Sequence, residues 1–305
     1  MRALTLAVLG FVVLLFSPVV GAADGDVYET WRAADDGTTV SLQATSITLP
    51  NGKLGAVVKI QPLDAKLASK GTATKVYEGP YVVSTLAVRP GAAAALMYRG
   101  GATPFVKVGL VDLASGKSTL VDLPRTAAAG SMPTGAVACA DADGFTLLWQ
   151  EQSTGGGAAQ GTIARVKADG TILKKPTSVG MIWSLGALVD DGRGYTLAVR
   201  YDGQAPDQTR IAFVTLTYDG TPEQHPWWGA RPAMVGEIQM VMIKGVATAV
   251  YRAGDATPSI LAIGADKVKG QWGKEAEPSR VLETAKAAHP FAVRAKNTAL
   301  DLVMR

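Results

Sequence analysis

The sequence is poor in the residues that most enzyme motifs require. It has one cysteine, Cys139, and two histidines, His225 and His289, among 305 residues. One cysteine excludes a disulfide within the chain, so stability must come from a large packed core. Two histidines exclude a three-histidine zinc site and leave few ways to form a Ser-His-Asp triad. A Gly-x-Ser-x-Gly elbow, a phosphate-binding glycine loop and a His-Glu-x-x-His pair are also missing. We therefore identify no catalytic residue or metal site, and we expect no cofactor.

The sequence also has few charges. Charged residues make up 18%, with a scattered net charge of +4, while hydrophobic residues reach 48%. That hydrophobic content excludes general disorder. No basic arm with interleaved aromatic residues occurs, so no nucleic-acid partner is expected. The acidic segments Asp141–Gly144 and Asp190–Gly192 lack the ligand spacing of a calcium loop and predict tight turns instead. Cys139 lies in an apolar run, which predicts a small buried side chain.

Residues 1–23 have the order of a secretory signal peptide. Met1 and Arg2 give a positive start, Leu4 to Phe16 is apolar, and Gly21 to Ala23 supplies small residues for cleavage. The apolar run is shorter than the ~20 residues of a membrane-spanning helix. We expect export to a periplasmic or extracellular location with no stable membrane insertion after cleavage; an uncleaved anchor is the alternative.

A repeat of about 50 residues organises the rest of the chain. Short apolar runs follow Gly91, Gly144, Gly194 and Gly245, and a fifth copy follows Asn297. Another apolar run precedes each of these turn residues, which predicts a hairpin. A second hairpin follows each complete copy, with turns at Gly116, Gly170, Gly220 and Gly270. Sustained helical spacing of apolar residues is missing, so each repeat reads as four short antiparallel strands.

Four strands at this period are the unit of a propeller blade, and the chain resembles β-propeller proteins without matching a specific repeat family. The resemblance implies an all-β fold of about five four-stranded blades, with six possible if the strand near Thr38 adds to them. We expect strands from the two chain ends to share one blade and close the ring. The predicted divisions are a signal peptide (1–23), an N-terminal lead-in (24–50) and the propeller domain (51–305). An open solenoid or two β-sandwich domains are the alternatives.

The longer connections between predicted blades carry aromatic and basic residues, and loops on a rigid scaffold commonly bind ligands. We define an aromatic-rich loop face from these connections and one loop within a blade. The candidate ligand-binding residues are Tyr81, Trp183, Trp227, Trp228, Arg231, His289 and Arg99. Aromatic rings also wedge between neighbouring sheets, so packing is the alternative role for each tryptophan.

These features favour an exported, non-enzymatic binding or scaffold propeller that recognises a glycan, a peptide or an envelope protein through the aromatic-rich loop face. A subunit of an envelope complex is a related possibility. The alternative from another class is a glycan-active hydrolase, which needs two carboxyl groups converging on the axis. Its candidate acids are Glu78, Glu151, Glu237 and Asp207. The pattern leaves the ligand, the partner and the oligomeric state open.

Overall fold

The computed structural model describes most of the chain after residue 24. The described residues are 25–127, 129–182, 184–201, 210–222, 227–228, 235–254, 259–267, 278–283, 290–296 and 299–304. For residues 201, 210, 227, 228, 235, 280 and 283 only the backbone is described. Within these ranges the fold is all-β, with one short 3-10 helix, η2 (Ala265–Lys267). No helix there is long and apolar enough to cross a bilayer.

Five four-stranded antiparallel sheets follow one another along the chain, and we call them blades I to V. The strands of blades I, II and III are β1 (Val27–Ala33), β2 (Thr39–Thr48), β3 (Leu54–Leu63), β4 (Thr74–Pro80), β5 (Val83–Arg89), β6 (Ala92–Arg99), β7 (Phe105–Asp112), β8 (Ser118–Leu123), β9 (Ser131–Ala140), β10 (Phe145–Ser153), β11 (Gln160–Val166) and β12 (Ile172–Met181). Those of blades IV and V are β13 (Ser184–Asp190), β14 (Tyr195–Tyr201), β15 (Arg210–Leu216), β16 (Trp227–Trp228), β17 (Val235–Ile243), β18 (Val246–Ala253), β19 (Ser259–Gly264) and β20 (Ser279–Glu283). Each strand pairs with the next one along the chain, so every blade is a meander.

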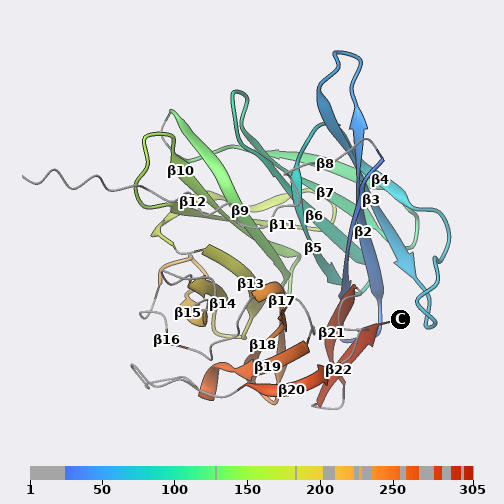
Figure 1. Cartoon of the computed structure of the whole chain (residues 1–305), viewed down its shortest axis with the longest axis vertical. Coiled ribbons are helices and arrows are strands. Elements are labelled where there is room, and N and C mark those ends of the chain that lie inside the picture. Colours follow the sequence, from blue (N-terminus) through green and yellow to red (C-terminus); the bar gives the residue numbers. More distant parts are fainter. Residues whose placement is uncertain are drawn as a thin grey trace, which may run out of the picture.

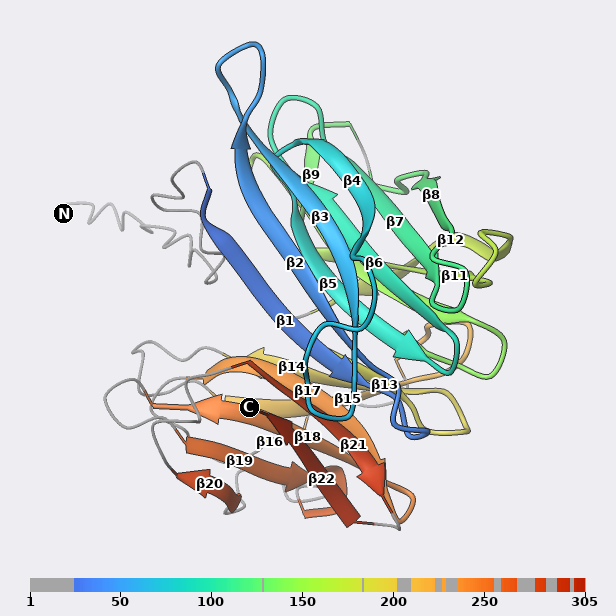
Figure 2. The same ribbon diagram turned by 90° about the vertical axis from the view of Figure 1, so that its right-hand side faces the viewer.

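The blades are arranged around a central axis (Figure 1). The first strand of each blade is innermost, and it packs beside the first strands of the neighbouring blades. This arrangement confirms the prediction of a propeller with five four-stranded blades. The connection between β2 and β3 extends well beyond the other loops (Figure 2).

The two ends of the chain close the ring differently from the prediction. The C-terminal strands β21 (Phe291–Lys296) and β22 (Ala299–Met304) form a two-stranded sheet of their own, and blade I is complete without them. β21 packs between β17 and β1, so the small sheet occupies a sixth position in the ring. The predicted shared blade is therefore wrong, because residues 24–50 are not a lead-in: they supply β1 and β2 of blade I.

Closure depends on apolar packing and on one buried amide. Trp31 and Leu63 of blade I pack against Ala292 of β21. Gln239 of β17, which is 2% exposed, donates through Nε2 to Phe291 O at 2.7 Å and accepts at Oε1 from Val293 N at 3.2 Å. The Gln239 side chain thus satisfies backbone groups of β21 that strand pairing would satisfy if the two chain ends shared a sheet.

The core consists of layers between neighbouring blades. In β6, Ala93, Ala95 and Met97 pack toward blade I, whereas Ala94 and Leu96 pack toward blade III. Successive side chains of a strand point to opposite faces, so a strand covered on both faces is apolar throughout. This explains the continuous apolar runs that mark each repeat.

Candidate functional site

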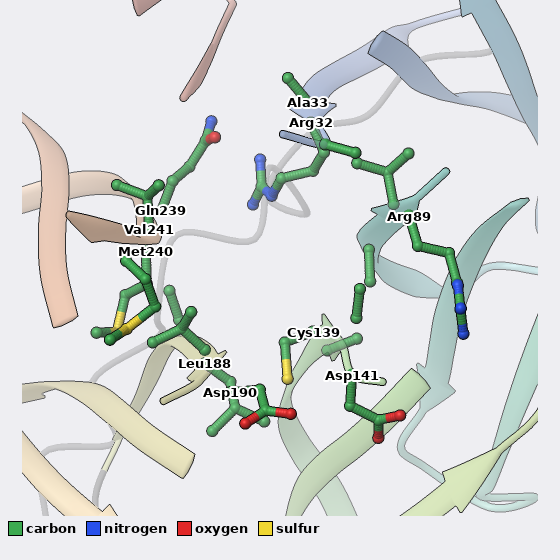
Figure 3. A pocket seen from close by; sticks show the side chains of 18 of the residues that line it. Arg32, Ala33, Arg89, Cys139, Asp141, Leu188, Asp190, Gln239, Met240 and Val241 are labelled. Carbon is green, nitrogen blue, oxygen red and sulfur yellow. The ribbon is translucent and has the colours of Figure 1, made fainter. Parts of the chain in front are cut away.

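A cavity of about 610 Å³ runs along the axis between the inner strands. Arg32 and Gln239 line one side of it, and Cys139, Asp141 and Asp190 line the other (Figure 3). The cavity walls are otherwise mostly apolar side chains of β5, β9, β13 and β17. The polar side chains of the cavity therefore come from two places: the ends of the inner strands at Asp141 and Asp190, and Arg32 and Gln239, which belong to a second polar group.

The aspartates at the turn end are occupied by structural hydrogen bonds. Asp141 accepts the Gly144 amide at 2.8 Å, the Thr146 hydroxyl at 2.7 Å and Arg165 Nε at 2.9 Å. Burial alone would raise the pKa of Asp141, but these hydrogen bonds outweigh burial and lower it. Asp190 accepts the hydroxyl of Tyr218 at 3.0 Å. These acids shape turns, as the sequence predicted.

Cys139 is a buried, free thiol, as expected from its apolar run. Burial raises its pKa well above the ordinary value, and the charges of Asp141 and Asp190 raise it further. A thiol that resists ionisation is a poor nucleophile. Within the described ranges, no group of three or more His, Cys, Asp and Glu side chains is placed to hold a metal ion.

A second polar group is formed by side chains of β1, β17 and β18, and we call it the axial cluster: Tyr28, Thr30, Arg32, Glu237, Gln239 and Arg252. Tyr28, Thr30 and Arg32 alternate along β1, so their side chains share one face of the strand. The Thr30 hydroxyl donates to Glu237 Oε1 at 2.7 Å, and Arg32 Nη1 donates to the same oxygen at 2.7 Å. The cluster thus joins side chains from opposite ends of the sequence.

Glu237 is anchored through one oxygen. Besides Thr30 and Arg32, Gln239 Nε2 donates to Glu237 Oε1 at 3.0 Å. Arg32 also donates to Trp31 O at 2.7 Å, which fixes its guanidinium beside the strand. The side chains of Arg32 and Glu237 are 20% and 17% exposed, so the ion pair is partly shielded from solvent. A carboxylate with three charge-assisted or amide donors is held in a defined position.

Tyr28 is the accessible member of the axial cluster. It is 42% exposed, and its hydroxyl hydrogen-bonds the Thr30 side chain. Burial by the protein around the axis raises the pKa of Tyr28 above 10.0, and the charge of Glu237 raises it further. Arg32, Thr30 and Arg252 oppose that rise. Arg252 lies over the Phe291 ring, 5.6 Å from its centroid. The axial cluster therefore brings a phenol near a carboxylate and its paired guanidinium group, and the charge of Arg252 also acts on the phenol.

The predicted ligand-binding residues are not brought together in the described part of the chain. Tyr81 follows β4 and packs against the core between blades I and II, where burial raises its pKa. Arg99 ends β6 and donates to Thr103 Oγ1 at 3.0 Å. The backbone of Trp227 and Trp228 forms β16, the outermost strand of blade IV, rather than the connection toward the axis that the sequence suggested. Three further predictions, Trp183, Arg231 and His289, lie outside the described residues.

Of the three acids considered for hydrolysis that lie in the described residues, one reaches the axial cluster. Glu78 lies on the outer strand β4 and pairs with Lys75 at 2.6 Å. Glu151 is buried and pairs with Arg125 at 2.7 Å. Glu237 is the member of the set that faces Thr30 and Arg32. Asp207 lies outside the described residues.

Sequence analysis missed Tyr28, Thr30 and Arg32 because it treated residues 24–50 as a lead-in. The available signal was the alternation of these three polar side chains, which is the period of a strand with one polar face. A recognised strand at that position would have placed all three on one side.

Solved structures of known proteins share the fold. No protein-family model and no curated protein matches the chain. A structure of Trypanosoma rangeli sialidase aligns with a TM-score of 0.53 and 13% identity over 91% of this chain and 52% of that one. The same sialidase in complex with 2,3-difluoro-KDN aligns with a TM-score of 0.52 and 14% identity over 90% and 50% of the two chains. This chain therefore spans about half the length of the sialidase chains it resembles.

The prediction of a non-enzymatic binding or scaffold propeller is wrong. Trypanosoma rangeli sialidase, whose fold the chain shares at 13% to 14% identity, is an enzyme. The axial cluster also contains one of the candidate acids, Glu237, whereas a pocket of aromatic residues and arginine without acids would have favoured binding. Together these findings favour the alternative from the sequence, a glycan-active hydrolase.

Proposed function

We propose that the chain is a glycan-active hydrolase and that Tyr28 and Glu237 are its reacting groups. The observation that carries the proposal is the accessible Tyr28 hydroxyl, which Thr30 connects to the anchored carboxylate of Glu237. Most glycosidases use a pair of carboxyl groups, but sialidases use a tyrosine nucleophile. The likeness in fold to sialidases is consistent with this second arrangement.

The charges of the axial cluster favour a sugar that carries a carboxylate. Arg32 and Arg252 both act on the Tyr28 hydroxyl electrostatically, so an anion beside Tyr28 would meet two positive groups. Guanidinium groups bind carboxylates through paired hydrogen bonds. A neutral phenol also avoids the repulsion that a carboxylate nucleophile would have with an anionic substrate. We therefore propose a glycoside of an acidic sugar as the substrate class.

The test uses a fluorogenic 4-methylumbelliferyl glycoside of N-acetylneuraminic acid. Its leaving group departs without protonation, so the assay depends on the nucleophile and its base. We expect Tyr28→Phe to lower kcat by about a thousandfold or more, because a nucleophile is lost. Glu237→Gln is expected to lower kcat by about a hundredfold. Tyr218→Phe is the matched control, because Tyr218 is 41% exposed and lies at a turn outside the axial cluster.

A second measurement traps the reaction. Trypanosoma rangeli sialidase with 2,3-difluorosialic acid is described as a covalent intermediate. The same reagent is expected to add its sugar mass to the wild-type protein, with the label on the Tyr28 peptide. A label on another residue would reject Tyr28 as nucleophile. No hydrolysis of aryl glycosides of acidic or neutral sugars would reject the proposed function.

We further propose that the enzyme works outside the cytoplasm, on the pattern of residues 1–23. The measurement is the mass of the protein recovered from the periplasmic or culture fraction. A mass beginning at Asp24 supports export, and a full-length protein retained in the cytoplasm contradicts it.

A further inference from the structure

Glu237 lies in an irregular stretch of β17. The ladder with β18 shifts register between Val235 and Ile238, so Glu237 has no paired residue on β18. Such an irregularity changes the direction of a side chain and interrupts the ladder that would hold its backbone. The position of the Glu237 carboxylate therefore depends strongly on the side-chain hydrogen bonds that it accepts.

These hydrogen bonds all end on one carboxylate oxygen. Thr30, Arg32 and Gln239 donate to Glu237 Oε1 at 2.7, 2.7 and 3.0 Å. Within the described residues, Oε2 of the same carboxylate accepts no hydrogen bond. Oε2 is therefore the oxygen that can contact a substrate or take up a proton, and the three donors at Oε1 set the direction in which it points.

Gln239 differs from the other two donors because a third strand holds it. Its Nε2 also donates to Phe291 O at 2.7 Å, and its Oε1 accepts from Val293 N at 3.2 Å, so both ends of the amide are bonded to β21. Gln239 is 2% exposed, so water has little access to these hydrogen bonds. An amide nitrogen carries two hydrogens in one plane, so the bond to β21 fixes where the other hydrogen points. That other hydrogen is the one available to Glu237.

We propose that Gln239 is a positioning residue, through which the docking of β21 sets the orientation of the Glu237 carboxylate. The inference rests on the proposed function. A glutamine that only closed the ring would need its contacts with Phe291 and Val293, but it would not need one with Glu237. The two-stranded sheet therefore contributes to the activity through a single amide group.

The kinetic test compares Gln239→Met with Leu63→Ala on the same 4-methylumbelliferyl substrate. Methionine has the length of glutamine without its hydrogen-bonding groups. Leu63→Ala weakens the apolar packing against Ala292 that also closes the ring, and it leaves the amide in place. Both variants are expected to lose stability, so kcat is measured at a temperature at which circular dichroism shows both to be folded.

We expect Gln239→Met to lower kcat by about tenfold or more with KM within about twofold of wild type, because a displaced carboxylate misaligns the reacting groups. Leu63→Ala is expected to keep kcat within about twofold of wild type, because Glu237 retains its three donors. Equal values of kcat in the two variants would overturn the positioning role.

A second variant serves if Gln239→Met does not fold. Gln239→Asn keeps the amide but is one methylene shorter, so it cannot reach both β21 and Glu237. It is expected to lower kcat by about tenfold, again with little change in KM. A wild-type kcat in Gln239→Asn would show that Glu237 does not need this donor, and the proposal would fail.

A measurement without turnover separates this inference from the proposed function. The carboxyl resonance of Glu237 in protein labelled with carbon-13 glutamate is assigned by its loss in Glu237→Gln. We expect this resonance to move in Gln239→Met, which removes a hydrogen-bond donor, and to keep its wild-type position in Leu63→Ala. An unmoved resonance in Gln239→Met would overturn the inference even if the wild-type protein hydrolyses the substrate. If the resonance moves but no acidic glycoside is cleaved, the contact stands and the proposed function fails.

Discussion

The hydroxyl of Tyr195 lies 2.8 Å from Thr146 Oγ1, which donates to Asp141 Oδ2 at 2.7 Å. Arg165 donates to the same carboxylate oxygen at 2.9 Å. Tyr195 belongs to blade IV and the other three residues to blade III, so this chain of polar groups crosses an interface that is otherwise apolar. Burial raises the pKa of Tyr195 from 10.0 to about 12. Protonation of one phenol is thus linked to the stability of the interface.

The stability of the protein is expected to fall between about pH 10 and pH 12. In that range an unfolded Tyr195 has lost its proton while the folded one keeps it, so unfolding is favoured as the pH rises. The stability linked to this phenol is fully present below pH 10 and is lost as the pH approaches 12. Urea unfolding at pH 8 and pH 11.5 measures it. Tyr195→Phe is expected to lose less stability between these pH values than Tyr218→Phe, and equal slopes would contradict the linkage.

The residues of the axial cluster were harder to predict from the sequence than the residues of the apolar core. The sequence identified Glu237 among several acids but assigned it no partner. Its partners Thr30 and Arg32 lie more than 200 positions away, a separation that local periodicity does not bridge. Trp227 and Trp228 attracted attention as large aromatic residues, yet their backbone lies on an outer strand.

At the scale of strands and turns, the repeated glycines have two different physical roles. Gly91 has a positive φ of 74°, and a side chain there would meet open space. Gly144 has no such backbone requirement, but an added Cβ would lie 2.1 Å from Val166 O on the third strand of its blade. Gly194 has the same close approach to Leu216 O. One position therefore needs conformational freedom and the others need space.

Gly144→Ala is expected to be more destabilising than Gly91→Ala. The backbone of β11 would have to move to admit the methyl group, which we expect to cost at least about 3 kcal/mol. Alanine at Gly91 costs about 1 kcal/mol, because only the left-handed backbone conformation is strained. Chemical denaturation of both variants measures the difference. If the two losses are equal, the close approach at Gly144 is relieved elsewhere and the argument from space fails.

The turn spacing predicted most strands of blades II to V, because strands covered on both faces are apolar and their hairpins need glycine. The same signal failed for β1. That strand carries Tyr28, Thr30 and Arg32 on one face, which forms part of the axial cluster. Local sequence patterns are weakest where function replaces packing.

At the scale of the whole molecule, the side chain of Gln239 helps to close the ring of blades. The sequence had predicted closure through a blade shared by the two chain ends. Gln239 contacts Phe291 O, Val293 N and Trp31 O, so one amide connects blade V, the two-stranded sheet and blade I. Strand count and period predicted a closed ring, but pairing between distant strands left no local trace. The predicted number of four-stranded blades is confirmed, and the predicted shared blade is not.

Gln239→Leu is expected to lower the free energy of unfolding by about 3 kcal/mol, because three backbone groups lose their hydrogen-bond partner. Gln150→Leu is the matched control. Gln150 is also buried but makes a single side-chain hydrogen bond, from Nε2 to Thr134 Oγ1 at 3.1 Å, so a loss of about 1 kcal/mol is expected. Urea denaturation measures both. Similar losses in the two variants would mean that apolar packing alone closes the ring.

The contact between Thr30 and Glu237 spans 207 positions of the chain. Each blade pairs strands that are consecutive in sequence, so early blades can fold while translation is still adding later ones. The two halves of the site meet only after blade V has been synthesised and has docked beside blade I. A nascent or prematurely terminated chain would therefore contain well-folded sheets without the axial cluster, and the proposed activity would begin only with the last step of assembly.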